Sequence, residues 1–483
     1  MDAFPILLFW MLAAVGIFGH RSILIYLFFA TMPFGSFAVI PTQITAGLTL
    51  TPAPIIACLL VARTFINARS LHFAASALFA PRGLMLLLLF WLVAVTVTML
   101  MPRVFADIVE VTPMKMLLFM HKEYLRPTNQ NFSQVAYLTI SACTVVAFAR
   151  LMMDPEKQQV ALKGLCLGGA MLVFTGLLDW LTQYLPLTPL LDPFRTANYA
   201  LLIGVTIEGG VHRVVGLMPE ASSFGGLCVQ FLTLIYFLRH AITDTFLREK
   251  VVPVIGFLLL LFTWLSTSSS AYVALVILGV FVFFEWMWRA KNIRKGTKKS
   301  RDVELEFWLV FVGAGALFII CLVQPRILDP ITNLFDSLVL QKSKSVSFEE
   351  RQFWNKTSWD ALQSTYGLGV GMGGTRASNS IIAIFSNTGY IGGLLYFGFA
   401  LQSLLRRANP ADAINSAFVS ALRWSFLPLA VAGILAGTSA DFGLVNAFLF
   451  GTIFASALIS WKYDSSAANS AKPASPMIVS QAE

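Results

Sequence analysis

The sequence predicts an all-α polytopic integral membrane protein. Of its 483 residues, 57% are hydrophobic and 12% are charged, about half the charged share of an ordinary soluble protein. The mean hydropathy is +0.74. The apolar runs are continuous over about 18–22 residues, the length of a membrane-spanning helix, whereas the strands of a transmembrane barrel would alternate.

We expect about 12–14 transmembrane helices within residues 1–462. Residues 463–483 are rich in Ser and Ala, so they are predicted to be a disordered C-terminal tail. The candidate spans, about 13 in all, lie near residues 4–19, 22–40, 47–66, 83–101, 132–152, 159–182, 223–240, 251–266, 270–288, 306–324, 381–404, 418–437 and 442–460.

Basic residues predict the orientation. The loop at 289–305, the stretch 239–250 and Arg406-Arg407 fall on one side, which the positive-inside rule assigns to the cytoplasm. A nucleic-acid patch is a weaker interpretation of 289–305, because that run lacks interleaved aromatic residues and abuts a span. The external loops are then 102–131, 183–222 and a large loop, 325–380, between the spans that end near 324 and begin near 381.

The cysteines predict neither a disulfide framework nor a zinc site. The five are scattered through apolar segments, and no CxxC pair occurs. We therefore expect no metal and no cofactor.

The first polar segment, residues 211–225, carries Arg213 and Glu220 just before an apolar span. Ser222 and Ser223 stand where an N-cap is expected, and an arginine beside a helix N-terminus is a favourable anion site. His212 is a possible proton acceptor. In the alternative interpretation, Arg213 meets lipid headgroups and pairs with Glu220 at the surface.

The second polar segment, residues 325–380, is predicted to contain an amphipathic helix on the membrane surface. Glu349-Glu350-Arg351 leads into Phe353, Trp354, Trp359 and Leu362, which would hold Arg351 near the headgroups. Five glycines between Gly367 and Gly374 precede Arg376. Such a run, including Gly371 and Gly373, can form an anion-binding nest, although it is also compatible with a flexible turn.

Arg213, Arg351 and Arg376 together suit a lipid-linked diphosphate, because a planar guanidinium binds two phosphate oxygens at once. Asp441, in the turn between the last two spans, could orient an arginine or a sugar hydroxyl, but a turn-forming Asx role is the stronger interpretation.

These motifs resemble the O-antigen polymerase and O-antigen ligase superfamily over about residues 130–460. The likeness rests on Arg213-Val-Val-Gly216 with Pro219-Glu-Ala-Ser222, and on an external loop that carries Arg351 and Trp354. The loop then reaches Gly-x-Gly-x-Gly-x-Gly-Gly and Arg376-Ala-Ser-Asn379, followed by Asn387-Thr-Gly-Tyr-Ile-Gly392 and by Asp441.

The resemblance implies a metal-independent glycosyltransferase of the bacterial inner membrane, with its active site on the periplasmic side. Its substrate would be a polyprenyl-diphosphate-linked oligosaccharide, and its partners membrane lipids and chain-length and export proteins, but no nucleic acid. By this likeness Arg213 and Arg351 grip the diphosphate, and Glu220 is the candidate general base. The residues that would assist them are Arg376, Gly371, Gly373, His212, Trp354, Asn379 and Asp441.

One departure separates the alternatives within this superfamily. Ligases often carry a His-Asn pair after the glycine-rich turn, where this chain has Ser378-Asn379. The difference favours a polymerase of exopolysaccharide or O-antigen over a ligase that transfers glycan to lipid A-core. A flippase or transporter of lipid-linked glycans is the remaining alternative, but the candidate spans are almost free of the charges that would line a transport path.

Overall fold

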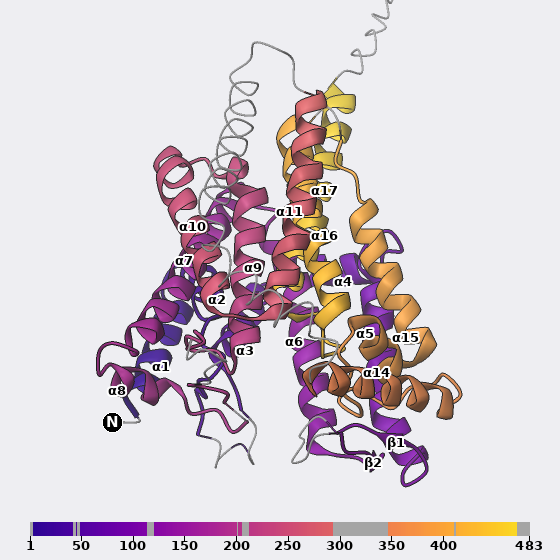
Figure 1. The fold of residues 1–483 in the computed structure, drawn as a ribbon. Coiled ribbons are helices and arrows are strands. Elements are labelled where there is room, and N and C mark those ends of the chain that lie inside the picture. Colours follow the sequence, from indigo (N-terminus) through magenta and orange to yellow (C-terminus); the bar gives the residue numbers. More distant parts are fainter. Residues whose placement is uncertain are drawn as a thin grey trace, which may run out of the picture.

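The structure, a computed structural model, describes residues 3–41, 45, 49–113, 120–199, 201–204, 212–292, 346–409 and 412–470. In these ranges the protein is a helical bundle with one short antiparallel sheet, β1 Glu110–Val111 and β2 Glu123–Tyr124 (Figure 1). The predicted loop 102–131 is thus partly a hairpin.

Within the described ranges, eight helices are long and apolar enough to cross a membrane. They are α5 Met85–Val104, α6 Asn129–Leu151, α7 Pro155–Leu181, α9 Ala221–Leu238, α11 Ser269–Asn292, α15 Ser380–Leu405, α16 Ala413–Ala436 and α17 Gly443–Ser470. A ninth span results if α3 Pro52–Thr64 and α4 Ala68–Phe79, bent by 108°, count as one. The predicted class, a polytopic α-helical membrane protein, is confirmed.

The other helices are shorter. They are α1 Ala3–Phe18, α2 Arg21–Ala30, α8 Thr188–Leu191, α10 Val252–Leu265 and α14 Val346–Ser364, with helical turns η1 Asp192–Phe194, η2 Arg239–Ala241 and η3 Leu247–Val251. The predicted spans at 4–19, 22–40, 47–66 and 251–266 therefore correspond to α1, α2, α3 and α10, each shorter than a full span. The span predicted at 306–324 lies outside the described residues.

The span predicted at 22–40 is helical only as far as Ala30, and the sequence explains why. Pro33 disfavours helical backbone in the residue before it, and Gly35 follows. Ser36 then points away from the α2 axis, because its N–H and its hydroxyl both donate to the Leu217 carbonyl at 2.9 Å. The apolar run at 22–40 is thus not one continuous helix, and its last part supports the backbone of the first polar segment.

A cluster of phenylalanines forms the centre of the bundle. Phe28 and Phe29 of α2 meet Phe148 of α6 and Phe448 of α17, with ring centroids 4.9 to 6.4 Å apart. All four side chains are fully buried. Edge-on aromatic contacts of this kind contribute about 0.5–1.5 kcal/mol each beyond the area that they bury.

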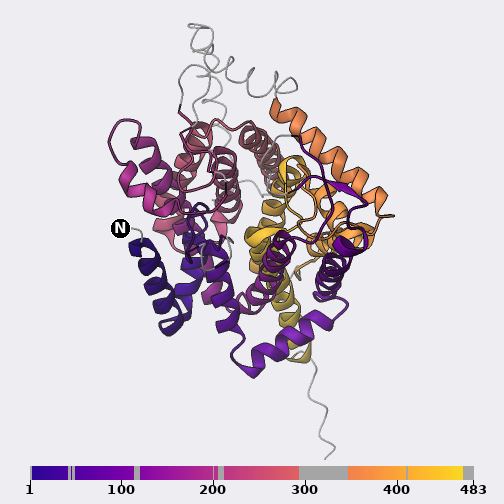
Figure 2. The same cartoon turned by 90° about the horizontal axis from the view of Figure 1, so that it is seen from below.

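The two ends of the bundle differ. At one end, Arg406 donates to the Arg82 carbonyl at 2.8 Å, and Lys163 lies 3.7 Å from Asp244. These contacts lie at the end that carries Arg406 and the stretch 239–250, which were predicted to share one side; the basic run 293–305 lies outside the described residues. At the other end lie the β1–β2 hairpin and α14, which runs across the spans instead of along them (Figures 1 and 2).

Candidate functional site

The first polar segment is held in an extended, irregular path before α9. The Val214 N–H donates to the Leu265 carbonyl at 3.2 Å, and the Leu202 N–H donates to the Pro219 carbonyl at 2.8 Å. The predicted N-cap at Ser222 or Ser223 is wrong, because α9 begins at Ala221 and Glu220 occupies the cap position. Both serine hydroxyls instead donate to Oε1 of the Glu220 carboxylate, Ser223 at 3.4 Å.

Arg213 lies half-buried beside the turn between α10 and α11. One terminal nitrogen donates to the Thr267 carbonyl at 3.3 Å, and the buried Nε has no hydrogen-bond partner in the described structure. Burial lowers the pKa of the Arg213 guanidinium, while the negative charge of Glu220 acts in the opposite direction. Glu220 is therefore close enough to stabilise the charged arginine.

A helix is present where one was predicted, as α14, and its position at the membrane surface stays a prediction. Its buried face follows helical spacing through Glu350, Trp354, Ser358, Ala361 and Leu362, all at most 9% exposed. A carboxylate at such a buried position needs a compensating positive charge.

Arg376 supplies a positive charge beside this face. Its guanidinium lies 4.1 Å from the centroid of the Trp354 ring. Its backbone is fixed, because the Arg376 N–H donates to the Thr112 carbonyl and its carbonyl accepts the Ser358 hydroxyl, both at 2.9 Å. Burial lowers the pKa of Arg376; the carboxylates of Glu220 and Glu350 oppose this effect, and the like charge of Arg351 adds to it.

The predicted arginines are connected through one shared carboxylate. Glu220 acts on both Arg213 and Arg376, which are 163 residues apart in the numbering, and Arg351 acts on Arg376. Within the described residues, none of these groups forms an ion pair at 4.0 Å or less. Three guanidinium groups and two carboxylates thus share one region with a net positive charge, which favours a multiply charged anion.

Several buried polar atoms around these arginines have no hydrogen-bond partner. They are Thr112 Oγ1, His212 Nδ1, Arg213 Nε, Thr267 Oγ1 and Trp354 Nε1. Most buried polar atoms in folded proteins have a partner, so unpartnered ones that gather in one region point to a functional site. Of the residues predicted to assist, His212 and Trp354 therefore belong to this region.

The glycine-rich turn is tightly packed, not flexible. Gly371 and Gly373 have φ values of +86° and +73°, in the region that favours glycine. A Cβ atom on Gly371 would lie 3.0 Å from the Thr98 backbone of α5, and one on Gly373 would lie 2.9 Å from the Gln130 carbonyl of α6. Close packing on α5 and α6 thus accounts for both glycines, and their contact with a diphosphate stays a prediction.

Asn379 and Asp441 have structural partners. The Asn379 side chain caps α15 by accepting the Ile381 N–H at 2.9 Å. The Asp441 carboxylate accepts the Gly443 N–H at 3.2 Å and the Ser141 hydroxyl at 3.1 Å, as the Asx-turn interpretation predicted. Burial raises the pKa of Asp441. No described contact connects either residue to the three arginines.

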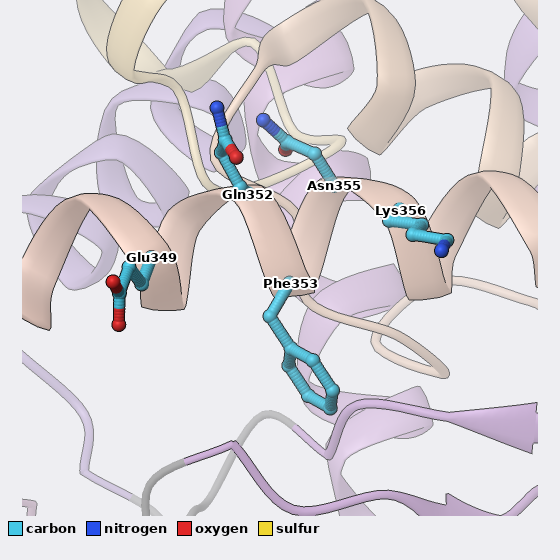
Figure 3. A pocket seen from close by; sticks show the side chains of 5 residues that line it. All are labelled: Glu349, Gln352, Phe353, Asn355 and Lys356. Atoms are coloured by element: carbon cyan, nitrogen blue, oxygen red, sulfur yellow. The ribbon is translucent and has the colours of Figure 1, made fainter. Parts of the chain in front are cut away.

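An open hollow of about 430 Å³ runs along a different part of α14 (Figure 3). Its lining residues are Glu349, Gln352, Phe353, Asn355 and Lys356. Glu349 and Phe353 project from one side of the helix, and Gln352 and Asn355 from the other (Figure 3). None of the three arginines lines this hollow, so we place the candidate site at the converging charges.

Sequence reasoning missed residues that shape the site. Glu350 was passed over although it lies one helical turn before Trp354, a spacing that puts both on one face. Thr267, whose carbonyl accepts a hydrogen bond from Arg213, was not among the predicted site residues. The buried ion pair between Asp179 and Arg195, whose atoms are 2.7 Å apart, was also missed, although an acid inside an apolar helix is a recognisable signal.

Comparison with known proteins adds no assignment. No model of a known protein family matches the chain. No curated protein matches it either. The fold is that of a multi-pass helical membrane protein, and its function has to be argued from the site.

Proposed function

We propose that the protein is a membrane glycosyltransferase that polymerises polyprenyl-diphosphate-linked oligosaccharide repeat units into exopolysaccharide or O-antigen. One observation supports the proposal: Glu220 acts electrostatically on both Arg213 and Arg376, Arg351 acts on Arg376, and within the described residues none of these groups is paired at close range. Guanidinium groups placed this way bind a diphosphate through several oxygens.

In the proposed reaction, negative charge develops on the diphosphate leaving group, beside these arginines. The bond between the anomeric carbon and the diphosphate oxygen breaks, and its electron pair leaves with the polyprenyl diphosphate. Arg213, Arg376 and Arg351 stabilise this developing negative charge. Trp354 supports Arg376 through a cation–π contact, because the guanidinium carbon lies over the ring face, 4.1 Å from the ring centroid.

Glu220 is the proposed general base. An acceptor sugar hydroxyl forms the new bond to the anomeric carbon, and its proton passes to Glu220. Both serine hydroxyls bond to Oε1, and within the described residues Oε2 accepts no hydrogen bond, so Oε2 is the atom that takes the proton. The positive-inside rule favours a cytoplasmic basic end, so we propose that this site faces the periplasm from a bacterial inner membrane.

One observation favours polymerisation over ligation. Ser378, at the position where ligases often carry histidine, is 4% exposed, and its N–H donates to Asn355 at 2.7 Å. A serine packed in this way cannot replace a catalytic histidine. The chain-length and export proteins that accompany polymer synthesis are the partners that this function requires.

The test uses purified protein in liposomes with a polyprenyl-diphosphate repeat unit as the only substrate. A ladder of lengthening products supports the proposal. Product that forms only after lipid A-core is added would identify a ligase. Movement of the lipid between leaflets without a covalent product would identify a flippase.

Arginine variants connect the activity to the site. We expect Arg213→Ala and Arg351→Ala each to lower ladder formation by about a hundredfold to a thousandfold, the cost of removing a group that stabilises transition-state charge. The matched control is Arg103→Ala, because Arg103 is an exposed arginine at the same end of the bundle. Normal product lengths in both site variants would refute the assignment.

A further inference from the structure

A buried ion pair lies behind the first polar segment. Asp179, near the end of α7, and Arg195, just after η1, have side chains that are 2% and 8% exposed. Oδ1 of Asp179 lies 2.7 Å from a terminal nitrogen of Arg195. An ion pair removed from water loses much hydration, so its retention calls for an explanation beyond stability.

The second carboxylate oxygen of Asp179 holds backbone. Oδ2 accepts the Val215 N–H at 2.7 Å and the Gly216 N–H at 3.0 Å. Arg195 completes the arrangement by donating to the Gly216 carbonyl at 3.2 Å. Two charged side chains thus fix consecutive peptide groups of the first polar segment, two and three residues after Arg213.

The fixed backbone is a turn, in which the Met218 N–H also donates to the Val215 carbonyl at 3.1 Å. Gly216 has φ +59°, and a Cβ atom there would lie 2.9 Å from the Phe224 ring of α9. Arg213 lies on one side of this turn and Glu220 on the other. The turn therefore determines how far apart the two charged groups lie and which way each points.

We propose that Asp179 and Arg195 are positioning residues for the catalytic arginine and carboxylate, acting through the Val215–Gly216 backbone. This inference rests on the proposed function, because it assigns the pair a role in that site. Displacing a reacting group by about 1 Å can lower a rate by about a hundredfold. We expect Asp179→Asn to lower kcat/KM by about that factor, because one carboxylate oxygen becomes an NH2 donor, so the remaining oxygen can accept from the two N–H groups or from Arg195 but not from both.

The decisive experiment is a double-mutant cycle in the reconstituted polymerase. Asp179→Asn, Arg213→Ala and the double variant are compared per folded molecule, together with binding of polyprenyl diphosphate that carries no glycan. Because the diphosphate is held by Arg213 and not by Glu220, the double variant should bind polyprenyl diphosphate no worse than Arg213→Ala alone. Binding losses that multiply, or normal binding and kcat/KM in Asp179→Asn, overturn the inference.

A milder variant keeps the test decisive if Asp179→Asn fails to fold. Arg195→Lys retains the charge opposite Asp179 but loses the planar fork that also reaches the Gly216 carbonyl. We expect it to fold and to weaken binding at least about tenfold, whereas a purely structural pair would lower only the unfolding temperature. The control is Glu285→Gln, which removes a partly buried partner of Arg289 in α11, away from the site.

The outcomes separate this inference from the proposed function. If Arg213→Ala abolishes binding and the ladder while Asp179→Asn does neither, the function stands and the positioning role fails. If Arg213→Ala leaves the ladder intact, the proposed function fails first.

Discussion

The arginines at the two ends of the bundle are held in different ways. At the basic end, Arg406 donates to the carbonyls of Arg82 and Gly83, and Arg63 donates to those of Gly16 and Gly19. At the other end, Arg213 makes one hydrogen bond of 3.3 Å, and Arg376 rests on an aromatic ring. Arg406 and Arg63 each use both terminal nitrogens on backbone carbonyls and so join loops, whereas Arg213 uses one and Arg376 makes no described side-chain hydrogen bond, which leaves more donors available to a ligand.

The largest expected effect comes from comparing two variants, one that removes Arg376 at the site and one that removes Arg406 at the basic end. We expect Arg376→Ala to lower ladder formation at least about a hundredfold, because it removes transition-state charge stabilisation. Arg406→Ala should leave the activity per folded molecule within about twofold, since no step of the proposed reaction uses it. Initial rates of the purified variants measure both, and equal losses would erase the distinction.

A second test asks what the ring beneath Arg376 contributes. A cation–π contact of this kind is worth about 0.5–2 kcal/mol, so Trp354→Ala should weaken diphosphate binding by about threefold to thirtyfold. Trp354→Phe retains a ring face but lacks the buried Nε1–H, which has no described partner. Titration of the three proteins with polyprenyl diphosphate should place Phe between Trp and Ala; an unchanged Kd in the Ala variant would exclude a supporting role.

A third test measures the structural role of the basic end. Arg406→Ala removes charged hydrogen bonds to two carbonyls, so we expect the free energy of unfolding to fall by about 1.5–3 kcal/mol. Thermal unfolding in mixed micelles reports the change. Arg351→Ala, which breaks no described hydrogen bond, is the control and should unfold near the wild-type temperature.

The smallest expected effect concerns the pH dependence of stability at Asp441. Burial raises the pKa of its carboxyl above the ordinary 3.8, so the folded protein binds this proton more tightly than the unfolded chain does. The contribution of Asp441 to stability therefore falls as pH rises from about 3.8 through the raised pKa. Asp441→Asn should be relatively more stable at neutral pH than at acid pH; a parallel pH profile would contradict this assignment.

Local patterns predicted more of the fold than long-range contacts did. The continuous apolar run after Pro155 and the apolar residues from Phe353 to Leu362 both predicted helices correctly. The run after Arg21 is helical only to Ala30, and Ser36 beyond it bonds Leu217, which is distant in sequence. Hydropathy indicates whether a segment can be buried. It does not indicate which residue, distant in sequence, the segment will contact.

The candidate site shows the same limit. The residue type predicted that Arg213 and Arg376 would suit phosphate, but only the tertiary structure places one carboxylate, Glu220, in range of both. The role of Asn379 as a helix cap was also hidden, since a cap depends on where α15 begins. The partnership of Asp179 with Arg195 required the fold itself.

The contact between two glycines joins the site to a membrane helix. A Cβ atom on Gly369 would lie 2.5 Å from the Gly389 nitrogen, and the Tyr390 N–H donates to the Gly367 carbonyl at 2.9 Å. The glycine-rich turn is therefore fastened to α15 where that helix is interrupted. A change of bilayer thickness that tilts α15 is therefore expected to move Arg376 as well, which would make the surrounding lipid a determinant of the proposed site's geometry.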